Sequence, residues 1–217
     1  MNRGLLLCKG PGAIKIKERE NLHSFDYIGW ANLHDIENNL LDISSRVDCL
    51  YLFRPRLINN LDQKAREKLS KLNVKKIKIV QPEKPKELLN INLSYVDKSQ
   101  SICPILKEWV NVSTGIRAFI DMLDNNKFDE FHIAGLDLLE KGQQYYYFNP
   151  KDALRTGLEH RKYSKMLKID KDQHCPMSSF EMVHERVLKH SNTKFVFYVE
   201  NKKYRDRFKD VENTIII

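Results

Sequence analysis

The sequence of 217 residues lacks any long hydrophobic run. Its apolar stretches, such as residues 4–8 and 195–199, are far shorter than the roughly 20 residues that a membrane-spanning helix needs. The first residues also lack the apolar core and the small-residue cleavage site of a signal peptide. We therefore expect a cytoplasmic protein without a membrane-spanning helix.

Paired cysteines are absent as well. The cysteines are Cys8, Cys49, Cys103 and Cys175, and no two of them form a C-x-x-C motif. This spacing argues against a zinc site and against a disulfide framework. We expect reduced thiols and no bound metal.

The charge balance is basic, with 37 Lys+Arg against 29 Asp+Glu. The content of 41% hydrophobic and 10% aromatic residues excludes wholesale disorder. Residues 186–209 hold eight Lys+Arg and only two acidic residues, so a nucleic-acid-binding module is one interpretation. No helix-turn-helix, zinc-finger or ribonucleoprotein motif organises this charge, so a solvated face is the commoner explanation. The same charge could also hold the protein in peripheral contact with an anionic inner membrane.

The arrangement of apolar segments predicts an α/β fold. Short runs rich in Val, Ile, Phe and Tyr occur at residues 4–9, 25–30, 49–53, 76–80, 130–134 and 194–199, and helix-length stretches separate them. This pattern is typical of buried parallel strands joined by crossover helices. We predict one Rossmann-like domain over residues 1–217, with a mostly parallel sheet flanked by helices.

Three helices can be predicted from periodicity. Residues 60–72 and 116–123 place apolar side chains on one face, and Ser178 and Glu181 have the S-x-x-E spacing of a capping box that would start the third helix. Between residues 138 and 173 the periodicity disappears, and an aromatic cluster at 145–148 lies among many basic residues. An insertion of that length predicts a functional lid.

Two segments could bind phosphate. Lys9, Gly10 and Pro11 follow the first predicted strand, although their spacing matches neither the dinucleotide fingerprint nor the Walker sequence, and an ordinary turn is the alternative. Ser113 and Thr114 precede the second predicted helix, where hydroxyl and amide groups either stabilise an anion or simply cap the helix.

Acid–base groups are fewer. Asp137 follows the strand at 130–134, so its carboxylate would lie where α/β proteins bind ligands, or would cap a turn. His132 lies inside that strand and reads as structural. His174 lies at the far end of the predicted lid, and closure of the lid could bring its imidazole over the cleft as a general base.

The order of these motifs resembles the bacterial lipooligosaccharide sialyltransferases, glycosyltransferase family 42. The resemblance rests on Gly10-Pro11 after a strand, Phe25-Asp26 with Asn32, Ser113-Thr114-Gly115, the segment 133–137, a tyrosine-bearing lid and then His174. It implies transfer of sialic acid with inversion from a cytidine-monophosphate (CMP) sugar, in surface-glycan synthesis and without a metal or other cofactor.

The resemblance also implies roles for single residues. His174 would activate the acceptor hydroxyl, and Tyr145 would contact the departing phosphate. The expected nucleotide site comprises Lys9, Gly10, Pro11, Asn32, Arg54, Ser113, Thr114, Gly115 and Asp137.

Departures from the family pattern concern the donor. The family usually has asparagine where Lys9 stands, asparagine-proline at Arg54-Pro55 and a tyrosine at Leu139, and it can carry arginine where Asn111 stands. A cation at Lys9 or Arg54 could pair with a phosphate or a sugar carboxylate, so Kdo stays open beside sialic acid. A nucleotide-binding relative without transferase activity and a homo-oligomer also stay open; the expected partners are a CMP-activated acid sugar and a glycan or lipid-linked glycan acceptor.

Overall fold

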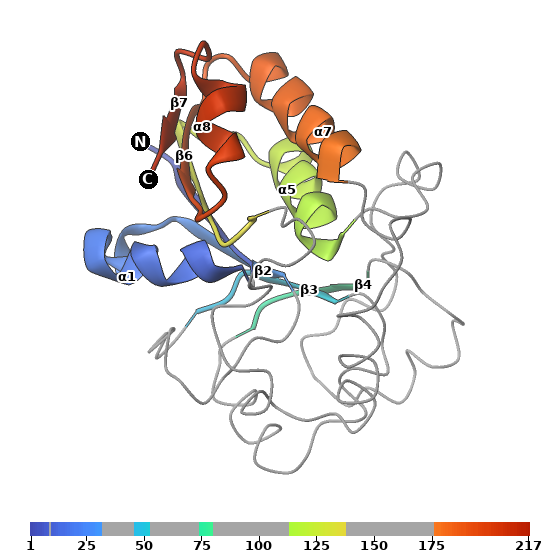
Figure 1. The fold of residues 1–217 in the computed structure, drawn as a ribbon. Coiled ribbons are helices and arrows are strands. Elements are labelled where there is room, and N and C mark those ends of the chain that lie inside the picture. Colours follow the sequence, from blue (N-terminus) through green and yellow to red (C-terminus); the bar gives the residue numbers. More distant parts are fainter. Residues whose placement is uncertain (9, 32–45, 53–73, 80–112, 138–175) are drawn as a thin grey trace, which may run out of the picture.

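The computed structural model describes residues 1–8, 10–31, 46–52, 74–79, 113–137 and 176–217 (Figure 1). Its centre is a seven-stranded sheet in which every neighbouring pair is parallel. The strands are β1 (Arg3–Leu7), β2 (Tyr27–Ala31), β3 (Cys49–Leu52), β4 (Ile77–Ile79), β5 (Glu130–Ala134), β6 (Lys194–Tyr198) and β7 (Thr214–Ile216). The order β4-β3-β2-β1-β5-β6-β7 confirms the predicted Rossmann-like α/β fold.

The strands form where the sequence places short apolar runs. Successive residues of β3 and β5 are all buried, as expected for strands covered by helices on both faces. Every strand predicted from the sequence is present, and its ends differ from the prediction by at most two residues. The sequence analysis missed β7, a short strand at the edge of the sheet.

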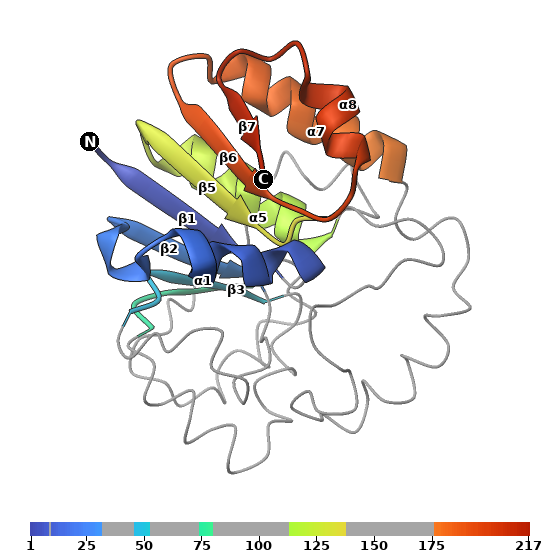
Figure 2. The same cartoon turned by 60° about the vertical axis from the view of Figure 1, so that its left-hand side comes forward.

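Helices cover both faces of the sheet. On one face lie α1 (Lys15–Arg19) and the short 3-10 helices η1 (Pro11–Ile14) and η2 (Leu22–Ser24). The other face carries α5 (Thr114–Asn125), α7 (Pro176–Lys189) and α8 (Lys203–Phe208) (Figure 2). Each face therefore has its own apolar core.

Aromatic rings fix α5 against the sheet. Phe131 of β5 is fully buried and stacks on Phe119 of α5, with ring centroids 5.8 Å apart, and on Phe128, at 4.9 Å. Burial of one such side chain contributes about 1.5–3 kcal/mol. This packing holds α5 against the sheet.

The predicted start of the third helix is wrong. α7 begins at Pro176, so Ser178 lies within the first turn and does not precede the helix. Proline suits the first helical position because its missing N–H has no partner there in any helix. The predicted helix at 60–72 and the predicted lid at 138–173 lie outside the described residues.

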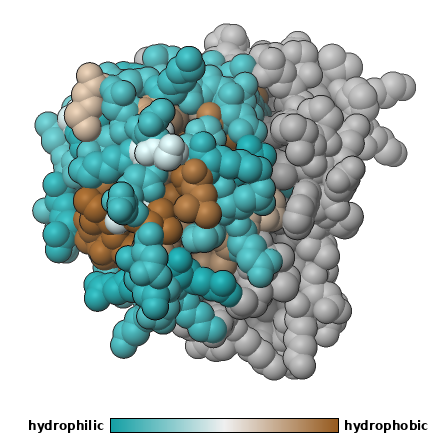
Figure 3. Space-filling view, turned by 90° about the horizontal axis from the view of Figure 1, so that it is seen from above, coloured by the Kyte–Doolittle hydropathy of each residue, from teal (hydrophilic) through white to brown (hydrophobic). Residues whose placement is uncertain are grey.

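The described surface is largely hydrophilic, with apolar residues grouped in patches on the face seen from above (Figure 3). The large apolar side chains that are exposed in the described ranges are Met1, Ile14, Leu188 and Ile215. A search of those ranges finds no helix with the length and apolarity needed to cross a bilayer.

Candidate functional site

The chain reverses its direction across the sheet between β1 and β5. From β1 it continues to β2, β3 and β4 on one side, and then returns to form β5, β6 and β7 on the other side of β1. α1, which follows β1, and α7, the next described helix after β5, accordingly lie on opposite faces. In open parallel sheets, ligands bind outside the carboxyl ends of the strands at such a reversal. The candidate site is therefore the edge formed by the residues that follow β1 and β5.

The segments after β1 and β5 lie against each other at this edge. The N–H of Cys8 donates to the carbonyl oxygen of Ala134 at 2.7 Å, and the N–H of Gly10 donates to that of Gly135 at 2.8 Å. Gly135 has a φ of 74°, a left-handed conformation that favours glycine. The predicted glycine turn is thus held directly beside the sharp turn that ends β5.

Asp137 joins these segments to the end of β6. Its Oδ2 accepts a hydrogen bond from the N–H of Gly12 at 3.0 Å, and its Oδ1 accepts one from the N–H of Glu200. The Nδ2 of Asn201 donates to the carbonyl oxygen of Asp137 at 3.0 Å. Burial raises the pKa of the Asp137 carboxyl, while the hydrogen bonds act in the opposite direction. The carboxylate lies at the predicted edge with both oxygens directed at protein amides.

The amino end of α5 meets the same edge. Ser113 is the N-cap, and its Oγ accepts a hydrogen bond from the N–H of Ile116 at 3.3 Å. A Cβ at Gly115 would lie 2.9 Å from Leu136 Cδ1 and 3.0 Å from Cys8 Sγ, so the first turn of α5 packs against the residues after β1 and after β5. The helix amino end places partial positive charge beside the glycine turn.

The structure brings together part of the predicted site. The predicted residues that gather at this one edge are Gly10, Pro11, Ser113, Thr114, Gly115 and Asp137. The predicted residues that lie outside the described ranges are Lys9, Asn32, Arg54, Tyr145 and His174. The roles of both groups stay predictions.

Two charged residues at the same edge, Lys15 and Glu200, were not predicted from the sequence. Lys15 donates to the carbonyl oxygen of Val199 at 2.9 Å and to that of Ile217 at 3.3 Å, and it forms an ion pair with Glu200 at 2.9 Å. The Glu200 side chain is 53% exposed. Glu200 could have been predicted from the sequence, because it follows strand β6 closely, as Asp137 follows strand β5.

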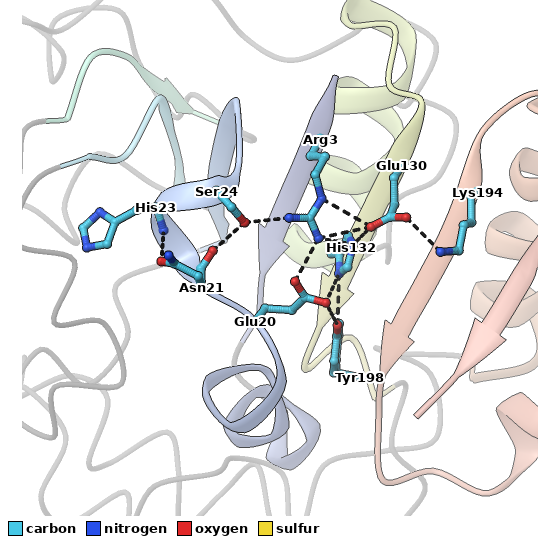
Figure 4. A network of polar contacts seen from close by, with 9 residues as sticks. All are labelled: Arg3, Glu20, Asn21, His23, Ser24, Glu130, His132, Lys194 and Tyr198. Carbon is cyan, nitrogen blue, oxygen red and sulfur yellow. Dashed lines mark hydrogen bonds and ion pairs between the residues drawn. The ribbon is translucent and has the colours of Figure 1, made fainter. Parts of the chain in front are cut away.

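A second polar cluster lies under α1 and η2, on the face that α1 covers (Figure 4). His132, 1% exposed, contacts Glu130 through Nε2 and the hydroxyl of Tyr198 through Nδ1, at 3.0 Å. Glu20 accepts from Arg3 at 2.8 Å and from the Tyr198 hydroxyl at 3.1 Å. Burial lowers the pKa of His132, although both glutamates raise it. These contacts support the structural interpretation of this histidine.

Two further candidate chemistries are a cysteine nucleophile and a bound metal, and the described residues offer no suitable group for either. Burial raises the pKa of the Cys8 thiol far above its ordinary value, so Cys8 stays protonated and is no nucleophile at neutral pH. A search of those ranges for three or more metal-ligating His, Cys, Asp or Glu side chains finds no such group.

The strand order and the helices on both faces define an open, Rossmann-like α/β fold, and one solved structure matches it. The sialyltransferase CstII from Campylobacter jejuni, solved with the substrate analogue cytidine-5'-monophosphate, superposes with a TM-score of 0.59 and 13% sequence identity. The match covers 95% of this chain and 83% of that chain. No family model and no curated protein matches the sequence. The chain therefore shares the fold of a sialyltransferase.

Proposed function

We propose that this protein is a metal-independent, inverting glycosyltransferase of the sialyltransferase kind. It moves sialic acid, or a related ulosonic acid such as Kdo, from a CMP-sugar to a glycan hydroxyl in surface-glycan synthesis. One observation carries the proposal. The residues after β1, the residues after β5 and the amino end of α5 meet where the strand order reverses, in a fold shared with a sialyltransferase solved with CMP.

We expect the donor phosphate to bind at this edge. The amino end of α5, with the positive end of its dipole, favours an anion there. The main chain at Gly10 and Gly12 is closely packed. A Cβ added at Gly12, for example, would lie 2.4 Å from the carbonyl oxygen of Tyr198. We expect Lys9 and Arg54 to add charge-assisted contacts to the phosphate or to the sugar carboxylate.

The chemistry follows from the donor. The bond between the anomeric carbon and the phosphate oxygen breaks, CMP leaves with the electron pair, and the sugar passes through an oxocarbenium-like state. The acceptor oxygen forms the new bond on the opposite face, while His174 takes the hydroxyl proton. Tyr145 donates a hydrogen bond to the departing phosphate, which stabilises the developing charge.

The basic surface suits an acceptor at an anionic membrane. The exposed basic residues on and beside α8 are Lys202, Lys203, Arg205, Arg207 and Lys209. Each basic side chain near an anionic bilayer contributes about 1 kcal/mol of attraction. Sedimentation with vesicles of anionic lipid, compared with neutral vesicles, tests this part of the proposal.

The donor class is tested by mass spectrometry. The whole protein is incubated with several CMP-activated acid sugars and a panel of glycan acceptors, and product masses identify the sugar transferred. Calorimetric titration with CMP, adenine nucleotides and short DNA runs beside it. CMP binding without transfer from any donor would indicate a nucleotide-binding relative. Preference for DNA at moderate salt would instead contradict the transferase proposal.

The catalytic base is tested by His174→Ala. Loss of a general base lowers rates by about 10²–10⁴-fold, and we expect kcat to fall in this range while the Kd for CMP stays within about twofold. His190→Ala is the matched control, because His190 follows the far end of α7 and is half-buried. A His174→Ala protein as active as the control would refute the assignment.

A further inference from the structure

Asp137 is a buried carboxylate that spans two distant parts of the chain. It is 2% exposed, and it accepts the N–H of Gly12, 125 residues away, and that of Glu200, 63 residues away. The Asn201 side chain adds a third bond, to its carbonyl oxygen. The residues after β1, β5 and β6 are therefore joined through one residue.

Two amide donors explain why a carboxylate stands at this position. An ionised Asp offers two acceptor oxygens and no donor, whereas Asn offers one oxygen and an NH₂ group that would face one of the amides. Hydrogen bonds from N–H groups to a carboxylate are also stronger than those to a neutral carbonyl. The two bonds that Asp137 makes thus need its charge as well as its shape.

The main chain of the glycine turn, residues 10–12, packs closely against the Asp137 carboxylate. A Cβ at Gly10 would lie 2.1 Å from Asp137 Oδ2 and 2.5 Å from the carbonyl oxygen of Gly135. The main chain at Gly10–Gly12 consequently follows the surface of the carboxylate, and its course depends on where that group sits.

We infer that Asp137 is a positioning residue of the donor site. This inference rests on the proposed function. In place of the direct nucleotide contact that the resemblance implies, Asp137 acts through the N–H groups of Gly12 and Glu200, because its two carboxylate oxygens accept from these groups and the residue is buried. It fixes the segments after β1 and β6 relative to the amino end of α5. The donor site is therefore preformed before the donor binds.

The test compares two buried carboxylates by substitution with the isosteric amide. Asp121→Asn is the matched control, because Asp121 is 5% exposed and accepts from the Tyr51 hydroxyl at 2.6 Å and from Lys78 at 2.7 Å, away from the edge. We expect both variants to lose thermal stability. Only Asp137→Asn should raise the calorimetric Kd for CMP, by about tenfold or more, the effect of losing a hydrogen bond to a charged group.

Hydrogen exchange gives a second measurement that needs no ligand. In Asp137→Asn, peptides containing residues 10–12 and 199–201 should exchange faster than in wild type, and in Asp121→Asn they should not. Equal shifts of the CMP Kd in both variants would overturn the inference. A wild-type protein that binds no CMP would end the proposed function, and unchanged exchange in Asp137→Asn would then overturn the positioning role by itself.

If Asp137→Asn does not fold, the milder variant Asn201→Ala tests the same inference. Asn201→Ala removes the side-chain bonds to the Asp137 carbonyl oxygen and to the N–H of Lys203, and it leaves the carboxylate in place. It should raise the Kd for CMP by a smaller factor, about threefold, and speed exchange at residues 199–201. An unchanged Kd together with unchanged exchange would contradict the inference.

Discussion

Replacement of Glu130 by Gln should destabilise the protein in a way that depends on pH. Glu130 accepts from Arg3 at 3.1 Å and from Lys194 at 2.9 Å, and it contacts His132. Burial alone would raise the pKa of Glu130, but Lys194, His132 and Arg3 outweigh it and lower that pKa from 4.5 to about 2. Gln keeps the shape and removes the charge, while Arg3 retains Glu20 as a partner at 2.8 Å.

The size of the effect follows from the shift. Each pKa unit corresponds to about 1.4 kcal/mol, so the lowered pKa of Glu130 sets an upper limit of about 3.5 kcal/mol. The Lys194 side chain is 49% exposed, and water screens its share of the attraction. We therefore expect Glu130→Gln to lose about 2 kcal/mol of unfolding free energy at pH 7.

The pH dependence has a definite sign. A carboxyl whose pKa is lower in the folded state than in the unfolded state stabilises the fold at pH values above the unfolded pKa, and this stabilisation disappears as the pH falls through the folded pKa. The difference between wild type and Glu130→Gln should therefore shrink as the pH falls from about 5 towards 2.

Urea unfolding followed by circular dichroism at several pH values measures this difference. Asp129→Asn is the control, because the side chain of Asp129 is 64% exposed and pairs with the amino terminus at 3.8 Å. The control should change stability by less than about 0.5 kcal/mol. A Glu130→Gln difference that stays constant over the whole pH range would refute the electrostatic reasoning.

Three further substitutions have expected outcomes that can be measured. Gly10→Ala places a methyl group 2.1 Å from Asp137 Oδ2 and should lower thermal stability by about 1–3 kcal/mol and weaken CMP binding in calorimetry; unchanged values would contradict the close packing. Lys78→Met leaves the buried Asp121 without its ion pair and should lower the unfolding free energy in urea by about 3–5 kcal/mol, whereas a neutral effect would argue against that pair. Phe131→Ala should lower the same quantity by about 3–5 kcal/mol, and a loss below 1 kcal/mol would be inconsistent with its full burial.

The fold could be predicted because parallel strands leave a strong local signal. A strand buried on both faces is a short run of apolar residues, and β5, at Glu130–Ala134, was placed at its observed ends. β7 was missed because three residues give too little periodicity, although three consecutive isoleucines at 215–217 were a usable signal. The capping-box prediction at Ser178 failed because Pro176 provides an equally good helix start.

Only the location of the site could be predicted from the sequence, and that prediction came from one rule. The rule that ligands bind at the carboxyl ends of parallel strands placed Gly10 and Asp137 at one edge from sequence alone. The partners of Asp137 could not be predicted, because they depend on Gly12 and Glu200 being adjacent in space. The same limit applies to Lys15, whose contacts with the end of β6 arise only when α1 packs on the sheet.

The central position of β1 has a consequence for synthesis of the chain. β1 leaves the ribosome well before β5, yet one of its two edges pairs with β5, and the contact between Arg3 and Glu130 spans 127 residues. Until β5 emerges, a nascent chain carries an unpaired edge on an apolar strand that is central in the finished sheet, and such edges recruit other chains. A truncated product that stops before β5 should therefore aggregate, and co-expression with a fragment carrying β5, β6 and β7 should restore its solubility.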